Sequence, residues 1–158
     1  MGAVLQHFLD KFEEFKVLPA GESFNIEVSD QEATAAANEF LTENKAQVKQ
    51  FLKQSTGLAL DIDKPSIDFL DDGIILSAKG GMGFLKAKAS LTANVLWDGG
   101  PVVDVRSVDV PFISVSPQKL NSSVKKMLGQ LTEKVEEYAE ISSFKLTYGS
   151  AILEAVKK

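Results

Sequence analysis

Residues 85–97 read LKAKASLTANVLW, and this stretch decides the class of the fold. Its odd-numbered residues are all apolar, whereas the even-numbered ones are polar as far as Asn94. An apolar residue at every second position is typical of a β-strand with one buried face. The turn-forming sequence DGG follows at residues 98–100, so we expect residues 102–115 to return as the partner strand in a central antiparallel hairpin.

The returning segment changes its phase midway. Val103 and Val105 occupy odd positions, but Val108 and Val110 occupy even ones. One extra residue near Ser107 explains this change, and such a β-bulge would bend the sheet.

Four further segments have a strand pattern. They are residues 24–28, 60–69, 74–79 and 142–156. We expect residues 71–73, which read DDG, to form a hairpin turn in which Gly73 supplies the positive φ. Residues 80–83, which read GGMG, are expected to form a corner, and residues 142–156 to close the sheet as a single strand.

Apolar residues recur at helical spacing in three other parts of the chain. These parts are residues 3–16, residues 30–56 and residues 117–138. Asn44 and Gln47 have the spacing of a capping box, so the middle part is expected to contain two helices. Gly57 is expected to end the second of them.

Together these elements predict an α+β fold, in which a long curved antiparallel sheet wraps around two long amphipathic helices and an N-terminal helix is added. We place the N-terminal amphipathic helix at residues 1–18 and a single α+β domain at residues 19–158. Two roles remain open for the first helix. Its apolar stripe either docks on the domain or contacts a membrane interface or a partner protein.

The composition excludes several classes of function. The chain has no cysteine, which excludes disulfides, zinc–thiolate sites and cysteine nucleophiles. A net charge of −5 and a pI of about 4.9 disfavour binding to nucleic acid and a purely electrostatic hold on anionic lipid. No apolar run approaches the ~20 residues of a transmembrane helix. We expect a soluble cytoplasmic protein, or an extracytoplasmic one if a native anchor has been removed.

The sequence contains no complete catalytic or metal-binding constellation. His7 is the only histidine, and we expect it to be an ordinary surface or boundary residue because no nucleophile motif accompanies it. Residues 61–73 are rich in aspartate but lack the ligand spacing of a calcium loop. Lys86 and Lys88 are expected on a solvated strand face, from which they could also steer an anionic headgroup. We therefore predict that the protein is not an enzyme and uses no metal and no cofactor.

Small residues on the predicted apolar faces leave two alternatives open. Alanines recur along residues 85–97 and again at residues 33–37 of the second helix. They either let helix and sheet pack closely or leave room for a guest molecule. If they leave room, the candidate ligand-binding residues are Ala87, Ala89, Leu91, Ala93, Leu128 and Leu131.

One segment carries a resemblance to a known group. Residues 110–120 read VPFISVSPQKL, which joins the bent strands to the long helix through Ser116-Pro117. With the Asp-Gly turns and the order of elements over residues 22–156, this pattern resembles small bacterial TULIP-like (tubular lipid-binding) domains. The resemblance implies an apolar cleft that accepts lipid tails. The chain departs from the group in having no lipobox cysteine, and a cystatin-like sheet gripping one helix is the competing architecture.

Two functions follow as hypotheses. The first is non-catalytic binding of a hydrophobic or lipid-like ligand in a helix–sheet cleft. The second is a structural or protein-interaction module with a filled core and no small-molecule ligand. Such a module would pair with a protein partner, or form a homodimer, through a sheet edge or the N-terminal helix.

Overall fold

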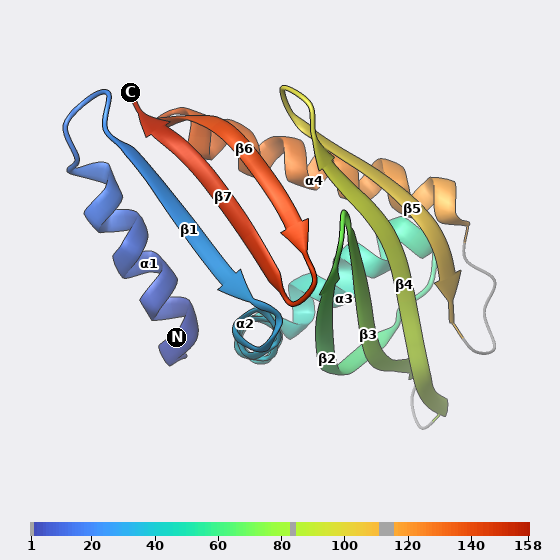
Figure 1. The fold of residues 1–158 in the computed structure, drawn as a ribbon. Coiled ribbons are helices and arrows are strands. Elements are labelled where there is room, and N and C mark those ends of the chain that lie inside the picture. The colour runs from blue at the N-terminus through green and yellow to red at the C-terminus, as the bar shows by residue number, and fades with distance from the viewer. Residues whose placement is uncertain (1, 83–84, 111–115) are drawn as a thin grey trace.

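The computed structural model describes residues 2–82, 85–110 and 116–158. Over these residues it contains four helices and seven strands (Figure 1). In chain order they are α1 Ala3–Lys16, β1 Ser23–Ser29, α2 Asp30–Glu43, α3 Lys45–Thr56, β2 Asp61–Leu70, β3 Gly73–Met82, β4 Leu85–Trp97, β5 Pro101–Asp109, α4 Pro117–Glu136, β6 Ala139–Thr147 and β7 Ser150–Lys157. The predicted α+β class is confirmed.

The strands form two separate antiparallel sheets, so the prediction of one long curved sheet is wrong. One sheet has the order β1-β7-β6 and the other the order β2-β3-β4-β5. They lie side by side in Figure 1, with the three-stranded sheet on the left. Periodicity within a strand does not reveal its neighbours, and β1 pairs along its whole length with β7 from the other end of the chain.

The hairpin of β4 and β5 forms as predicted, but it is not central. Trp97 pairs with Pro101 next to the turn, and Ser90 pairs with Asp109 at the far end. Because β5 is the last strand in its sheet, the hairpin lies at an edge. Residues 111–115, predicted to end the returning strand, lie outside the described residues.

Three turn predictions need correction. Residues 142–156 form the hairpin β6–β7 rather than one strand, because Gly149 reverses the chain with a φ of 83°. Gly80 and Gly81 continue β3 instead of forming a corner, and residue 83 lies outside the described residues. The turn at residues 71–73 forms, but Asp72 takes the positive φ, at 55°.

The two sheets meet at their turns. The backbone N–H of Asp72 donates to the carbonyl of Leu146, and that of Gly149 donates to the carbonyl of Phe69, each over 3.0 Å. The side chains of Phe69, Leu146 and Ala151 form a buried cluster beside these bonds. The sheets therefore share part of their core although no strand runs from one into the other.

Helices bind the free edges of the four-stranded sheet. On the β2 edge, the Thr34 hydroxyl of α2 accepts from the N–H of Ile67 over 2.9 Å and donates to its carbonyl over 3.2 Å. On the β5 edge, Asn121 of α4 accepts from the N–H of Val105 over 3.2 Å. Figure 1 shows α4 extending behind both sheets. These bonds give partners to backbone N–H and C=O groups that would otherwise be unpaired on an edge strand.

The segment between β1 and β2 is divided into α2 and α3, as predicted. Ser29 and Glu32 form a reciprocal capping box at the start of α2. Asn44 forms no such box, because its side-chain amide donates to the carbonyl of Phe40 over 3.0 Å instead. Gly57 ends α3 in the left-handed conformation, with a φ of 80°. Within the described residues, no helix is both long and apolar enough to span a bilayer.

The first helix docks on the three-stranded sheet. Phe15 is buried and stacks on Phe24 of β1, with ring centroids 3.8 Å apart. Phe12 meets the edge of Tyr138 at 5.9 Å between centroids. Two roles were left open for this helix, and these contacts support the first, in which the helix docks on the protein's own domain.

Candidate functional site: an apolar cavity

A cavity of about 510 Å³ lies between the four-stranded sheet and the helices α2, α3 and α4. We call it the apolar cavity, because Ser77 and Ser90 are the only polar residues among the described residues that line it. The lining comprises Ala37, Phe40, Leu41, Val48, Phe51, Leu52, Leu60, Ile62, Pro65, Ile67, Leu76, Ser77, Ala78, Gly80, Ala89, Ser90, Leu91, Val108, Val110, Leu120 and Val124. Its volume falls within the range of about 300–1,000 Å³ that is usual for ligand sites.

Small side chains on the sheet leave the space open. Ala78 of β3 pairs with Ala89 of β4, and Gly80 pairs with Ala87. Gly80 has no side chain at all, and a Cβ atom built on it would make only an ordinary contact with the Cβ of Ala89, at 3.7 Å. This end of the sheet therefore lacks the long side chains that would fill the interior.

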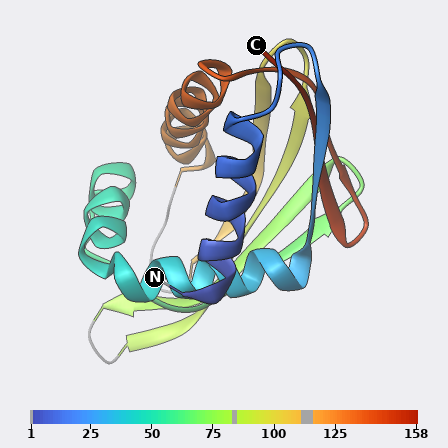
Figure 2. The ribbon, with the colours of Figure 1, turned by 90° about the vertical axis from the view of Figure 1, so that its left-hand side faces the viewer.

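Helix α3 borders the cavity without packing tightly on the sheet. Val48, Phe51 and Leu52 line the cavity, yet none of the α3 side chains that the structure describes is buried. The helix contacts α2 and α4. In Figure 2 it stands on the opposite side of the molecule from the three-stranded sheet. Its apolar face thus borders empty space rather than a packed core.

The cavity is open to solvent on one side. Phe40 of α2 is 48% exposed and Leu76 of β3 is 39% exposed, and both line the cavity. Large apolar side chains that remain this exposed in a concave site are typical of a binding surface.

The predicted β-bulge shapes the remaining wall of the cavity. Thr92 pairs with Ser107 but the next residue, Ala93, pairs with Val105, so one extra residue is inserted in β5. The bulge predicted near Ser107 is confirmed. It reverses the phase of the strand, which brings Val108 and Val110 to the cavity while Val103 and Val105 remain in the core.

The structure places the six candidate ligand-binding residues in three environments. Ala89 and Leu91 line the apolar cavity. Ala93 is buried against Val103 and Val105, and Leu128 packs on the same cluster. Ala87 is half-buried and Leu131 is 52% exposed, and neither is among the described lining residues. The apolar stripe of α4 therefore contributes Leu120 and Val124 to the cavity, and both precede Leu128 and Leu131, the α4 residues singled out from the sequence.

Several lining residues gave no distinctive signal in the sequence. Leu76 and Ala78 belong to an ordinary strand pattern, and Phe51 and Leu52 to an ordinary helical stripe. Each looks like a core residue in the sequence, and only the three-dimensional arrangement of sheet and helices shows that it borders the cavity. The alternation of apolar residues in β3 could have indicated which of them share a sheet face with Ala89. It could not have indicated that this face borders a cavity.

A smaller charged pocket adjoins the apolar cavity. It has a volume of about 230 Å³ and is lined by Leu41, Lys45, Ala46, Val48, Lys49, Leu60, Asp61 and Ile62. Four of these residues, Leu41, Val48, Leu60 and Ile62, also line the apolar cavity. We call this smaller space the charged pocket.

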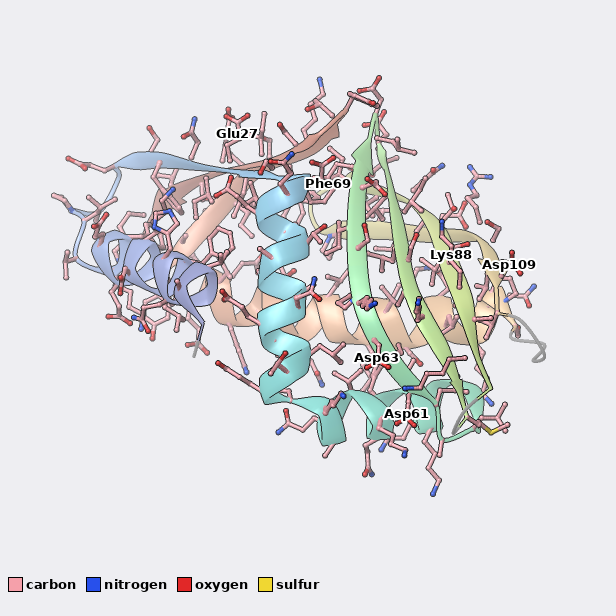
Figure 3. All side chains as sticks on the ribbon, turned by 90° about the horizontal axis from the view of Figure 1, so that it is seen from below. Glu27, Asp61, Asp63, Phe69, Lys88 and Asp109 are labelled. Atoms are coloured by element: carbon pink, nitrogen blue, oxygen red, sulfur yellow. The ribbon has the colours of Figure 1, made fainter. Side chains whose placement is uncertain are left out.

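Ion pairs link α3 to the edge strand β2 at the charged pocket. The Lys45 ammonium lies 3.5 Å from Asp63, and that of Lys49 lies 3.4 Å from Asp61. Lys86 of β4 lies 2.5 Å from the other oxygen of Asp63. This hydrogen bond, aided by the positive charges of Lys86 and Lys45, lowers the pKa of Asp63. The same bond, aided by the negative charges of Asp63 and Asp61, raises the pKa of Lys86. Figure 3 shows Asp61 and Asp63 near α3 and Lys88 farther from it.

The remaining sequence candidates show no site of their own. His7 is exposed on α1, as predicted, with the Phe8 ring 6.1 Å away between centroids. Of the aspartates between residues 61 and 73, Asp61 and Asp63 pair with lysines, while Asp71 accepts from the backbone N–H of Tyr148. Solvent-facing strand positions and a turn account for these acids, as the sequence suggested.

Comparison of the chain with models of known protein families and with curated proteins found no match.

Proposed function

We propose that the protein binds a hydrophobic or lipid-like molecule in the apolar cavity and does not transform it chemically. The observation that carries this proposal is a cavity of about 510 Å³ lined almost wholly by apolar side chains, two of which, Phe40 and Leu76, remain substantially exposed. A ligand that covers them would gain the free energy of removing apolar surface from water. The resemblance to TULIP-like domains implies the same function.

The alternative of a module with a filled core has less support. Protein interiors are close-packed and contain few voids larger than a water molecule. The space beneath α3 is much larger than such a void, and α3 itself has no buried side chain among those the structure describes. An apolar helix face that borders an empty space favours the hypothesis that a guest molecule packs against this face.

A displacement assay with fatty acids of increasing length tests the proposal. Each buried methylene contributes about 0.8 kcal/mol, or roughly a fourfold gain in affinity. From caprate to myristate we therefore expect displacement of a bound fluorescent fatty acid to tighten by about two orders of magnitude, until the cavity is full. Failure of the fluorescent probe to bind, or equal potency along the series, would overturn the proposal.

A further inference from the structure

The charged pocket and the apolar cavity together have the layout of a site for an amphiphile. They share a boundary formed by Leu41, Val48, Leu60 and Ile62. A molecule with its tail in the apolar cavity would therefore place its other end in the charged pocket, between α3 and the start of β2. The chemistry of that pocket then selects the headgroup.

The charges at this pocket have a positive excess. The side chains joined by its ion pairs are Lys45, Lys49 and Lys86 against Asp61 and Asp63, three lysines and two aspartates, with a net charge of +1. This local excess contrasts with the net charge of −5 on the whole chain. One added negative charge would bring the group to neutrality.

Two of the lysines are held more loosely than the third. Lys86 bonds one oxygen of Asp63 at 2.5 Å, whereas Lys45 lies at the longer distance of 3.5 Å from the other oxygen. The side chains of Lys45 and Lys49 are 68% and 48% exposed, against 32% for Lys86. They lie one turn apart on α3 and both line the charged pocket. Their ammonium groups are the ones that a bound anion could engage.

We propose that the ligand is an amphiphile with an anionic headgroup, which occupies the charged pocket beside Lys45 and Lys49 while its tail occupies the apolar cavity. This inference rests on the proposed function, since it adds a headgroup to the hydrophobic ligand. Charge complementarity carries it: the charged pocket, which shares part of its lining with the cavity, is lined by Lys45 and Lys49 against the single acid Asp61, and the ion pairs that extend to Asp63 and Lys86 keep the same positive excess.

Matched ligands separate this inference from the proposed function. Laurate, dodecanol and dodecylamine have tails of equal length and anionic, neutral and cationic heads. By isothermal titration calorimetry we expect laurate to bind about three- to tenfold more tightly than dodecanol, and dodecylamine to bind more weakly than either. Added salt should reduce the advantage of laurate over dodecanol. Equal affinity for all three would overturn the anionic headgroup and leave the hydrophobic site standing, whereas binding of none would overturn both.

Two substitutions that break the same ion pair give opposite expected effects. Lys49→Met should weaken laurate binding about threefold, because it removes a positive charge from the pocket. Asp61→Asn should strengthen it by a similar factor, because it removes a negative one. Dodecanol should bind both variants as it binds the wild type. Lys145→Met, an exposed position on the three-stranded sheet, is the control and should change nothing. Shifts of the same sign in Lys49→Met and Asp61→Asn would contradict the inference, since loss of the ion pair alone would explain them.

Discussion

Ala78 of β3 and Ala89 of β4 lie directly opposite each other, and both line the apolar cavity. Farther along the same two strands, Ile74 lies opposite Ala93, and there the interior is packed. Two alanines on the same face of β4 thus have different surroundings. The bulk of the residue opposite, together with the approach of α4, decides whether an alanine borders a core or a hollow.

Tryptophan substitutions at these two alanines should have different effects on stability. In Ala89→Trp the indole can enter the cavity, so we expect the free energy of unfolding to stay within about 1 kcal/mol of the wild type. In Ala93→Trp, the control, the ring has no room beside Val103 and Val105, and overpacking should cost ~1–3 kcal/mol or more. Urea unfolding monitored by circular dichroism measures both. Equal losses would mean that the space beside Ala89 is filled.

Truncation of a leucine should also distinguish the shared core from the surface. Leu146, 2% exposed, packs with Phe69 where the two sheets meet, and Leu146→Ala should cost ~2–5 kcal/mol. Leu131 is 52% exposed on α4, and Leu131→Ala should change the free energy of unfolding by about 0.5 kcal/mol or less. Thermal and urea unfolding would report both values. A loss below ~1 kcal/mol for Leu146→Ala would contradict a core shared between the sheets.

Two separate glycine-to-alanine substitutions should change the free energy of unfolding in opposite directions. Gly149 has a φ of 83°, so an added Cβ should cost about 1 kcal/mol through backbone strain alone, since no atom lies within 4 Å of it. Gly129 lies inside α4, also with nothing within 4 Å of an added Cβ, and Gly129→Ala should gain about 0.5–1 kcal/mol of helix propensity. The midpoints of urea unfolding measure both shifts. A stabilising effect of Gly149→Ala would contradict the left-handed conformation of Gly149 in the β6–β7 turn.

Local features of the fold could be predicted from the sequence because they depend on neighbouring residues. The alternation of residues 85–97, the turn at Gly99 and the phase change near Ser107 correspond to β4, its turn and the bulge in β5. The partition of the strands into two sheets could not be predicted. It depends on β1 pairing with β7, and no local pattern encodes contacts between residues so distant in the chain.

The site could be predicted only in part for the same reason. The alternation placed Ala89 and Leu91 on an apolar face, and both line the cavity. It placed Ala93 on that face too, but only the approach of α4 and the pairing of β4 with β5 show that Ala93 is packed. Phe40 is another case, because its stripe predicts a buried residue, and its 48% exposure reflects the empty space beside it.

Titration of Asp63 tests the ion pairs beside the cavity. Its pKa lies below the ordinary 3.8, chiefly because Lys86 donates a hydrogen bond to it. A carboxyl with a lowered folded-state pKa contributes stability above its unfolded pKa, and this contribution is lost as the pH falls through the folded value. Lys86→Met should raise the pKa of Asp63 toward 3.8, as followed by carbon NMR of the carboxyl group. Lys88→Met, the control on the same strand, should leave it near the wild-type value. An unchanged pKa in Lys86→Met would contradict the pairing.

The binding of laurate to Ala89→Trp tests the central claim most directly. Native mass spectrometry of protein purified without detergent would count bound laurate on the wild type and on Ala89→Trp side by side, with circular dichroism to verify that the variant is folded. If the apolar cavity is the ligand site, the wild type binds laurate and the folded variant does not, because the indole occupies the space of the tail. Equal binding to both proteins, or no binding to the wild type, would contradict the account.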